Sequence, residues 1–381
     1  MGQMTPGNLT GQVGGTLELV RVISIVLAIG AGCGGSDGPD LSGLPACGTS
    51  SLLQVSPMGL GDLREIAPLG NLAPPSHTFP ADHIYFYPTI GAAVPVISPG
   101  AIRIVGATLQ KAVADGKPEL DDYGLDFYTC ADHHFYLLHL VSLAPALESK
   151  LGSLASSCDP PYTTNGYTIT HCRTTARVDL ATADPIGIAG GPTEGALDVG
   201  LIDHGSPPLA FVDPKRLDET VLYAACPLDQ FAPEVHDAMV AKLAVNGMPR
   251  TAAPVCGTVM QDVADTAQGR WYFDDTPEED HHLALVHQNW DPSIGAFSIG
   301  TSVPGVGSTT LTFTPATAGR VNLDFDRVTA DGNIYCYELG TMHALVQLVT
   351  ATQLEIEVVP GATCGDPSTW AFGANAATFV R

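Results

Sequence analysis

The sequence predicts a mainly β protein in which a first β-rich domain is followed by a short helical connector and a second, sandwich-like β domain. Three observations predict this fold. From residue 55 onward, short apolar runs alternate with turns that contain glycine and proline. Near residues 228–246, apolar side chains recur every four positions, as in a helix that is buried on one side. After residue 257, strand-like runs return at intervals of roughly 8–12 residues, a spacing typical of β-sandwiches.

The length and composition fit a globular protein of two domains. The chain has 381 residues, 45% of them hydrophobic and only 15% charged, and single domains usually contain roughly 100–200 residues. The formal net charge of -24 argues against a nucleic-acid partner, because phosphates require a basic surface. The same charge disfavours electrostatic docking on anionic lipid, so any membrane attachment would be through a lipid anchor. The oligomeric state stays open.

The N-terminal segment is typical of an exported protein. Residues 19–29 are apolar apart from Arg21. This segment is too short to cross a bilayer, but its length suits the apolar core of a signal peptide. The following GAGC resembles a bacterial lipoprotein signal, in which residues 1–32 are removed and Cys33 becomes the lipidated first residue. An ordinary cleaved signal peptide is the alternative, and the lack of Lys or Arg before Leu19 leaves the true start codon open. We expect a bacterial cell-envelope protein, lipid-anchored to the membrane or otherwise periplasmic or extracellular.

The other cysteines predict disulfides. They are even in number, widely spaced and contain no CxxC pair, which favours disulfides in an oxidising compartment over a zinc-thiolate site. Sequence proximity favours the pairs Cys158–Cys172, Cys226–Cys256 and Cys336–Cys364, which leaves Cys47–Cys130. Eight cysteines allow about 105 connectivities, so other pairings remain open.

The chain divides by composition into four parts after the signal segment. Residues 33–54 are rich in glycine, serine and proline and are predicted to form a flexible tether. The first β domain is expected over residues 55–212 and the helical connector over residues 213–256. The second β domain is expected over residues 257–381.

Within the first domain, several elements have recognisable signals. Residues 94–110 read as two strands joined by a turn at residues 98–100. Residues 124–139 begin as an apolar, aromatic strand, and residues 146–154 contain helix formers that predict a short helix. Asn165 and Gly166 are a strong hairpin-turn signal.

A group of metal-ligand residue types precedes an apolar, aromatic strand at residues 84–87. His77, Asp82 and His83 lie within seven residues of one another, and neutral imidazoles and carboxylates are the ligands that zinc takes. Clusters of His and Asp are also common in ordinary polar turns, which is the alternative for this segment. Residues further along the chain bear on the choice.

Five elements in order resemble the lysostaphin-type zinc endopeptidases of peptidoglycan, which have the duplicated hybrid motif fold. That family carries a His followed closely by an Asp, a hairpin, a later Tyr-x-His-Leu, a glycine-rich strand-turn segment and a final His-x-His. The likeness spans residues 59–203. It implies zinc as the cofactor and cell-wall peptide, or another envelope component, as the partner. The matching elements are His77 with Asp82, residues 94–108, Tyr136–Leu140, residues 183–190 and residues 196–200.

The chain departs from the family motif at three places. The first spacing is one residue longer, so either Asp82 or His83 takes the place of the carboxylate ligand. Tyr-x-His becomes Tyr-x-x-His, which ends at His139. Ala196-x-Asp198 replaces His-x-His, and because alternate residues of a strand share a face, Asp198 still projects where the third zinc ligand would be.

The resemblance therefore supports two hypotheses. In the first, His77, Asp82 or His83, and Asp198 bind zinc or another divalent ion, and His139 serves as general acid/base or oxyanion stabiliser of a metalloendopeptidase. In the second, the β scaffold is an inactive envelope-binding module, because Ala196 removes one catalytic imidazole. Under both hypotheses the site residues are expected to converge. The small side chains of Ala196 and Gly200 are expected to leave room for an ion, a water or a substrate backbone above the strand.

Overall fold

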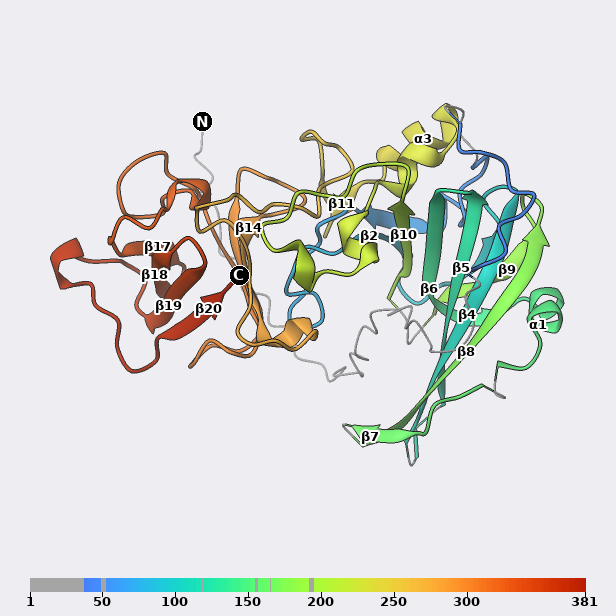
Figure 1. Ribbon diagram of the computed structural model, residues 1–381, viewed down its shortest axis with the longest axis horizontal. Helices are drawn as coiled ribbons and strands as arrows, with labels where there is room; N and C mark the ends of the chain where they lie inside the picture. The colour runs from blue at the N-terminus through green and yellow to red at the C-terminus, as the bar shows by residue number, and fades with distance from the viewer. Residues whose placement is uncertain are drawn as a thin grey trace, which may run out of the picture.

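The computed structural model describes residues 38–48, 53–114, 116–117, 119–154, 157–164, 166–191 and 195–381. The prediction of a mainly β protein is confirmed, because antiparallel sheets make up most of the regular structure and the helices are short. Two separate large hydrophobic cores lie side by side along the longest axis of the molecule (Figure 1). The predicted signal segment and Cys33 lie outside the described residues.

The first core is built on a ten-stranded antiparallel sheet. Eight strands follow the order β1-β2-β10-β6-β5-β4-β8-β7, while β9 pairs with β6 and β3 pairs with β9. This order places β10 between β2 and β6, although these strands come from distant parts of the sequence. The ten strands are β1 (Leu63–Ala67), β2 (His83–Pro88), β3 (Ala93–Ile97), β4 (Ile102–Val113), β5 (Leu120–Cys130), β6 (His133–Leu143), β7 (Tyr162–Thr164), β8 (Tyr167–Leu180), β9 (Pro185–Gly190) and β10 (Leu197–Asp203).

The two strands predicted over residues 94–110 form as β3 and β4, but they do not pair with each other. β3 pairs with β9, whereas β4 lies between β5 and β8. The turn between them is bound to another loop, because Ser98 donates its backbone N–H to Asp184 and accepts one from Ala183. The expected hairpin is therefore wrong, and β4 leaves the turn in a different direction.

The helices of the described residues are few, and the predicted connector packs against the first core. The short helix expected near residue 150 forms as α1 (Pro145–Leu151). Of the helix expected over residues 228–246, only α3 (Pro233–Val240) forms, because proline is tolerated at the first helical position but not inside a helix. Buried side chains from residues 213–256 pack into the first core: these side chains are Leu228, Phe231, Met239 and Leu243.

The remaining short elements lie in the connector and the second domain. The connector also contains α2 (Glu219–Leu222) and a hairpin of β11 (Ala244–Val245) and β12 (Met248–Pro249). Five 3₁₀ turns are assigned in the described parts of the chain. They are η2 (Pro214–Arg216), η3 (Pro227–Gln230), η4 (Glu279–His281), η5 (Phe325–Arg327) and η6 (Pro367–Thr369).

The second core lies between two four-stranded antiparallel sheets, as expected for a sandwich-like domain. Aromatic rings from both sheets meet at its centre, where Phe297 lies 5.0 Å from Tyr337 between ring centroids. The first sheet contains β13 (Gly269–Trp271), β14 (Leu283–His287), β15 (Gly295–Ile299) and β16 (Thr309–Phe313). The second contains β17 (Tyr335–Leu339), β18 (Met342–Thr350), β19 (Gln353–Pro360) and β20 (Ala377–Val380).

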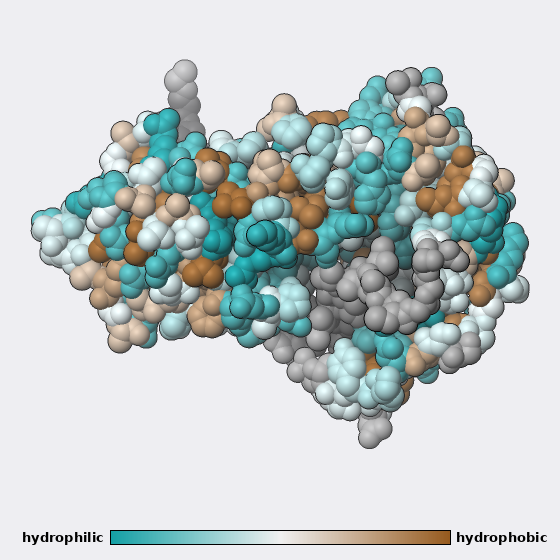
Figure 2. All heavy atoms as spheres, in the orientation of Figure 1, coloured by the Kyte–Doolittle hydropathy of each residue, from teal (hydrophilic) through white to brown (hydrophobic). Residues whose placement is uncertain are grey.

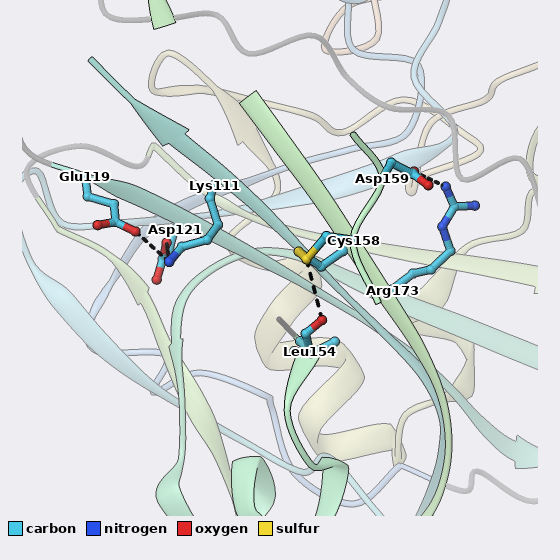
Figure 3. The surroundings of a disulfide bond; sticks show 8 residues. Lys111, Glu119, Asp121, Leu154, Cys158, Asp159 and Arg173 are labelled. Atoms are coloured by element: carbon cyan, nitrogen blue, oxygen red, sulfur yellow. Dashed lines mark hydrogen bonds and ion pairs between the residues drawn. A yellow bond between two sulfur atoms is a disulfide. The ribbon is translucent and has the colours of Figure 1, made fainter. Parts of the chain in front are cut away.

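All four predicted disulfides form: Cys47–Cys130, Cys158–Cys172, Cys226–Cys256 and Cys336–Cys364. Figure 3 shows the surroundings of Cys158, where Asp159 and Arg173 form an ion pair at 2.5 Å. Four disulfides fit a protein exported to an oxidising compartment. None of the helices in the described ranges is long and apolar enough to cross a membrane. Apolar side chains gather only in small groups on the face drawn in Figure 2.

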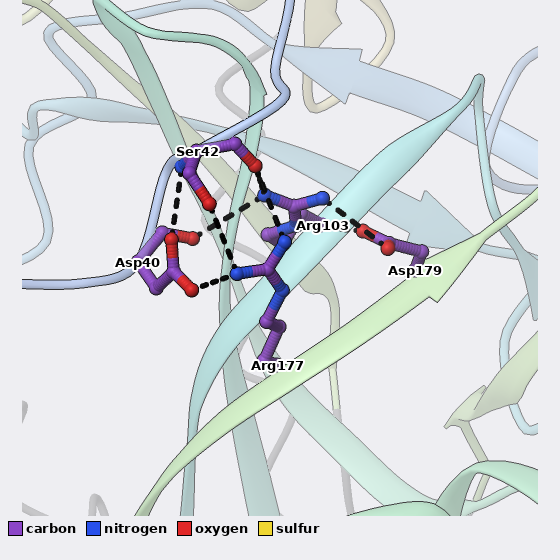
Figure 4. Close-up of polar contacts among 5 residues, drawn as sticks. All are labelled: Asp40, Ser42, Arg103, Arg177 and Asp179. Atoms are coloured by element: carbon purple, nitrogen blue, oxygen red, sulfur yellow. Dashed lines mark hydrogen bonds and ion pairs between the residues drawn. The ribbon is translucent and has the colours of Figure 1, made fainter.

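The described part of the predicted tether is bound to the first domain. Figure 4 shows Arg103 donating to the Ser42 carbonyl at 2.6 Å, and Arg177 forming an ion pair with Asp40. The Cys47–Cys130 disulfide adds a covalent link to the sheet. Residues 38–48 are therefore not a free tether, because arginines of β4 and β8 bind their backbone and carboxylate groups.

Candidate functional site

Asp198 occupies the centre of the candidate site because β10 lies between β2 and β6. In the antiparallel register, Asp198 faces Tyr85 of β2 and Leu138 of β6. The residue is only 3% exposed, and a carboxylate so deeply buried requires partners of opposite charge or hydrogen-bond donors. Two histidines on the neighbouring strands provide them.

His83, the first residue of β2, lies between two carboxylates. Its Nε2 is 3.1 Å from Asp198 Oδ2, and its Nδ1 is 2.8 Å from Asp82 Oδ1. Burial alone lowers the pKa of this imidazole, but the negative charges of Asp198 and Asp82 outweigh that effect and raise the pKa to about 10. His83 is therefore protonated at neutral pH when no metal is bound.

His139 reaches the same carboxylate through a β-bulge. Its Nε2 is 3.2 Å from Asp198 Oδ2, and its Nδ1 is 2.8 Å from Asp122 Oδ2. The register shift between β5 and β6 makes Leu138 and His139 together face Gly124, and His139 has a φ of 70°. Non-glycine residues rarely adopt this left-handed conformation, and bulges commonly redirect a side chain near functional sites.

The bulge also decides which face of the sheet His139 shares. In a regular strand, Tyr136 and His139 would point to opposite faces because they are three residues apart. The extra residue turns His139 to the face of Tyr136, whose hydroxyl lies 3.4 Å from His83 Nδ1. Asp198 holds the pKa of His139 well above its ordinary value, although burial opposes this shift.

His77 lies at the edge of the group and differs in charge. Its ring centroid is 5.2 Å from that of His83 and 6.0 Å from that of Tyr85. Burial, reinforced by the charge of His83, lowers the pKa of His77 to about 4. This imidazole is therefore neutral at pH 7, which is the form that binds metals.

Asp82 and His83, the two residues expected as alternatives for one metal ligand, lie at different distances from Asp198. His83 faces Asp198, whereas Asp82 lies behind His83 and binds its other ring nitrogen. Burial raises the pKa of Asp82, but the hydrogen bond and charge of His83 outweigh it, and the resulting pKa is well below the ordinary value. Asp82 thus orients His83, in the way that carboxylates orient the histidine ligands of metal sites.

Part of the geometry fits a metal ion. Two ligands of a tetrahedral zinc ion at about 2.0–2.1 Å stand roughly 3.3 Å apart, close to the 3.1 and 3.2 Å that separate Asp198 Oδ2 from the two imidazoles. The contact of His83 Nε2 lacks hydrogen-bond alignment, and Nε2 and Asp198 Oδ1 have no hydrogen-bond partner among the described residues. His83 must lose its proton before Nε2 can bind a metal ion, because metal ligands are deprotonated.

Another part of the geometry does not fit a preassembled metal site. Among the described residues, only Cys47, Cys130 and His133 bring three such ligand atoms within 4.8 Å of one another. The first two form a disulfide, so that group is not a metal site. His83 and His139 approach the Asp198 oxygen from different directions, and the two imidazoles would have to move closer to share an ion.

No family model, curated protein or solved structure matches this chain. The likeness to lysostaphin-type endopeptidases therefore rests on the quoted motif residues alone, and the metal and catalytic roles stay proposals.

Several residues of the site were missed by the sequence analysis. Asp122, which binds His139, was not identified, and Tyr136 was quoted as a motif residue without its contact to His83. A pairing of β5 with β6 at a bulge had no signal in the sequence. The expected open space at Gly200 is absent, because a Cβ added there would overlap the Tyr136 ring. Ala196 is 7% exposed and packs with Tyr85 in a small apolar cluster, so no space is left there either.

Proposed function

We propose that this chain is an exported, divergent metallopeptidase-like protein that binds a divalent metal ion, most suitably zinc, and acts on cell-wall peptide. The observation that carries the proposal is the buried carboxylate of Asp198, placed 3.1 and 3.2 Å from two imidazoles that outer carboxylates hold in position. Metal-binding histidines are oriented by just such outer carboxylates. The metal ligands proposed are His77, His83 and Asp198.

The chemistry divides between the ion and the protein. A bound zinc ion would lower the pKa of its water towards 7 and polarise a peptide carbonyl. His139 is the candidate proton donor, because Asp122 fixes its Nδ1 and its raised pKa keeps Nε2 protonated at neutral pH. The leaving amine of a cleaved peptide needs such a proton. Tyr136, through its hydroxyl near His83, limits the motion of that ring.

A second function is favoured by the same ion pairs. With His83 and His139 protonated, Asp198 is already compensated, and the site is stable without a metal. Ala196, immediately before β10, also provides no imidazole. An inactive envelope-binding module on the same β scaffold is therefore the alternative proposal, with the chain tethered by a lipid on Cys33 in either case.

Metal binding by the purified protein separates the two proposals. We expect about one zinc ion per chain, with an affinity that rises with pH by about tenfold per unit for each proton displaced, because the pKa of His83 is about 10. Asp198→Ala is expected to abolish binding. His236→Ala is the control, since this histidine pairs with Asp237 on α3, away from the site.

The outcomes have distinct meanings. Metal binding with cleavage of wall peptide supports the metallopeptidase. Retention of peptidoglycan by a metal-free protein supports the binding module. Absence of both overturns the proposed function. Mass spectrometry of the native protein tests export separately: an acylated N-terminal Cys33 is expected, and an unmodified Cys33 behind an intact leader would contradict it.

A further inference from the structure

The loop that carries His77 and Asp82 reaches the second domain. Residues 70–82 precede β2, and in Figure 1 the chain before β2 runs next to the second domain. Local hydrogen bonds shape this loop, such as the reciprocal backbone bonds between Ala73 and His77 at 2.9 and 3.1 Å. Asp82, at the end of the loop, is tied to Asp198 through His83, whereas the middle of the loop makes its contacts elsewhere.

The ring of Phe79 is inserted between groups of the second domain. It is 3% exposed, and its centroid lies 5.2 Å from that of Tyr272 and 5.4 Å from that of His282. The guanidinium of Arg270 lies 4.8 Å from the same centroid. Removing a whole phenylalanine ring from water is favourable, so this insertion holds the middle of the loop.

Two polar contacts fix the loop backbone at the same point. The Phe79 N–H donates to Glu279 Oε2 at 3.0 Å, and Arg270 donates to the Pro80 carbonyl at 3.3 Å. Both partners belong to the second domain, about 200 positions away in the sequence. The carboxyl oxygen of Glu279 can accept this bond in either protonation state.

The fixed point lies within the site segment itself. His77 is two residues before Phe79 and Asp82 is three residues after it, so a shift of Phe79 moves both side chains. Displacements of about 1 Å are enough to spoil a metal or catalytic site. Glu279 is half-buried as a residue, and its carboxyl is directed at the Phe79 backbone, where burial raises its pKa to about 7.

We infer that the second domain is a positioning part of the candidate site, and that Glu279 and the groups around Phe79 hold His77 and Asp82 in place. The inference has two parts. The effect on metal affinity rests on the proposed function, whereas the placement of the loop by the second domain does not require a bound metal.

Glu279→Ala and Glu279→Gln in the full chain test the inference. The amide keeps an acceptor for the Phe79 N–H, whereas alanine removes it. We expect Glu279→Ala to increase hydrogen exchange at the Phe79 amide at least tenfold and to shift the ring signals of His77 in NMR spectra of the metal-free protein. Glu279→Gln is expected to restore both. Glu278→Ala, at an exposed neighbouring position, is the control and should change neither.

Zinc affinity is measured on the same proteins. A loss of about 10–100-fold in Glu279→Ala, rescued by Glu279→Gln, is expected, as for other outer partners of metal ligands. If wild type binds no zinc but the amide and ring signals respond as stated, the proposed function fails and the positioning role stands. If Glu279→Ala folds and leaves the Phe79 amide and the His77 ring unchanged, the inference is overturned.

Discussion

At the scale of single residues, the site depends on one buried carboxylate shared by two imidazoles. Burial raises the pKa of Asp198, but the charges of His139 and His83 outweigh it and keep the carboxylate ionised. Removing one member of such a group leaves the others buried without compensation. The histidines can lose their protons, and this reduces the free-energy cost of leaving them buried without the carboxylate.

Asp198→Asn tests this interdependence. The amide keeps the shape and removes the charge, so we expect a loss of about 3 kcal/mol in the free energy of unfolding at neutral pH. Denaturant unfolding of the metal-free protein measures the loss. Asp203→Asn on the same strand is the control, because that carboxylate accepts from Ser206 and the Gly205 N–H and pairs with His133 at 3.6 Å, and none of these groups belongs to the candidate site. Equal stability of the two variants would contradict the central role of Asp198.

Glu279 predicts a pH dependence of stability. Its pKa is about 7 in the folded protein, above the ordinary value of 4.5, so the folded state retains the proton longer than the unfolded state. The resulting stabilisation is fully present below about pH 4.5 and is lost as the pH rises through 7. Unfolding of wild type and Glu279→Gln across this window should show a decline with pH that is smaller in the variant. Identical slopes would refute the assignment.

At the scale of elements, the sequence predicts where strands form better than it predicts which strands pair with each other. The strands before and after residues 98–100 were expected, but their partners were not, because hydrogen bonds between Ser98 and the loop at residues 183–184 decide the direction of β4. The convergence of His83, His139 and Asp198 followed from motif order. The bulge at His139 did not, since the left-handed backbone there depends on pairing with Gly124.

Gly200 gives a prediction about the packing of β10 on β6. A Cβ at this position would overlap the ring of Tyr136, although the backbone of Gly200 itself permits alanine. Gly200→Ala should therefore displace Tyr136 and destabilise the protein by about 1–3 kcal/mol, with altered NMR signals from the His83 ring. Gly307→Ala, where a Cβ meets nothing within 4 Å, is the control and should be neutral. A fully stable Gly200→Ala with an unmoved Tyr136 would contradict this packing.

At the scale of the whole molecule, two cores share one boundary. Composition predicted two β domains, and the cores are separate. The boundary was not predictable, because the connector's apolar side chains fill the first core and the contacts between domains join distant residues. Asn289 donates to the Pro68 carbonyl at 3.0 Å, and Arg216 pairs with Asp275 at 2.9 Å.

These contacts predict cooperative unfolding. The Phe79 ring links the two cores because it belongs to the first domain and is buried among Tyr272, Ala284 and Val286 of the second. We expect wild type to unfold in one calorimetric transition and Phe79→Ala, which removes about 3 kcal/mol of packing, to unfold in two. Ile90→Ala is a matched control, since that side chain is 84% exposed and contributes little to either core. Two transitions already in wild type would mean that the boundary does not couple the unfolding of the two domains. Such a result would also contradict the positioning of the His77 loop by the second domain.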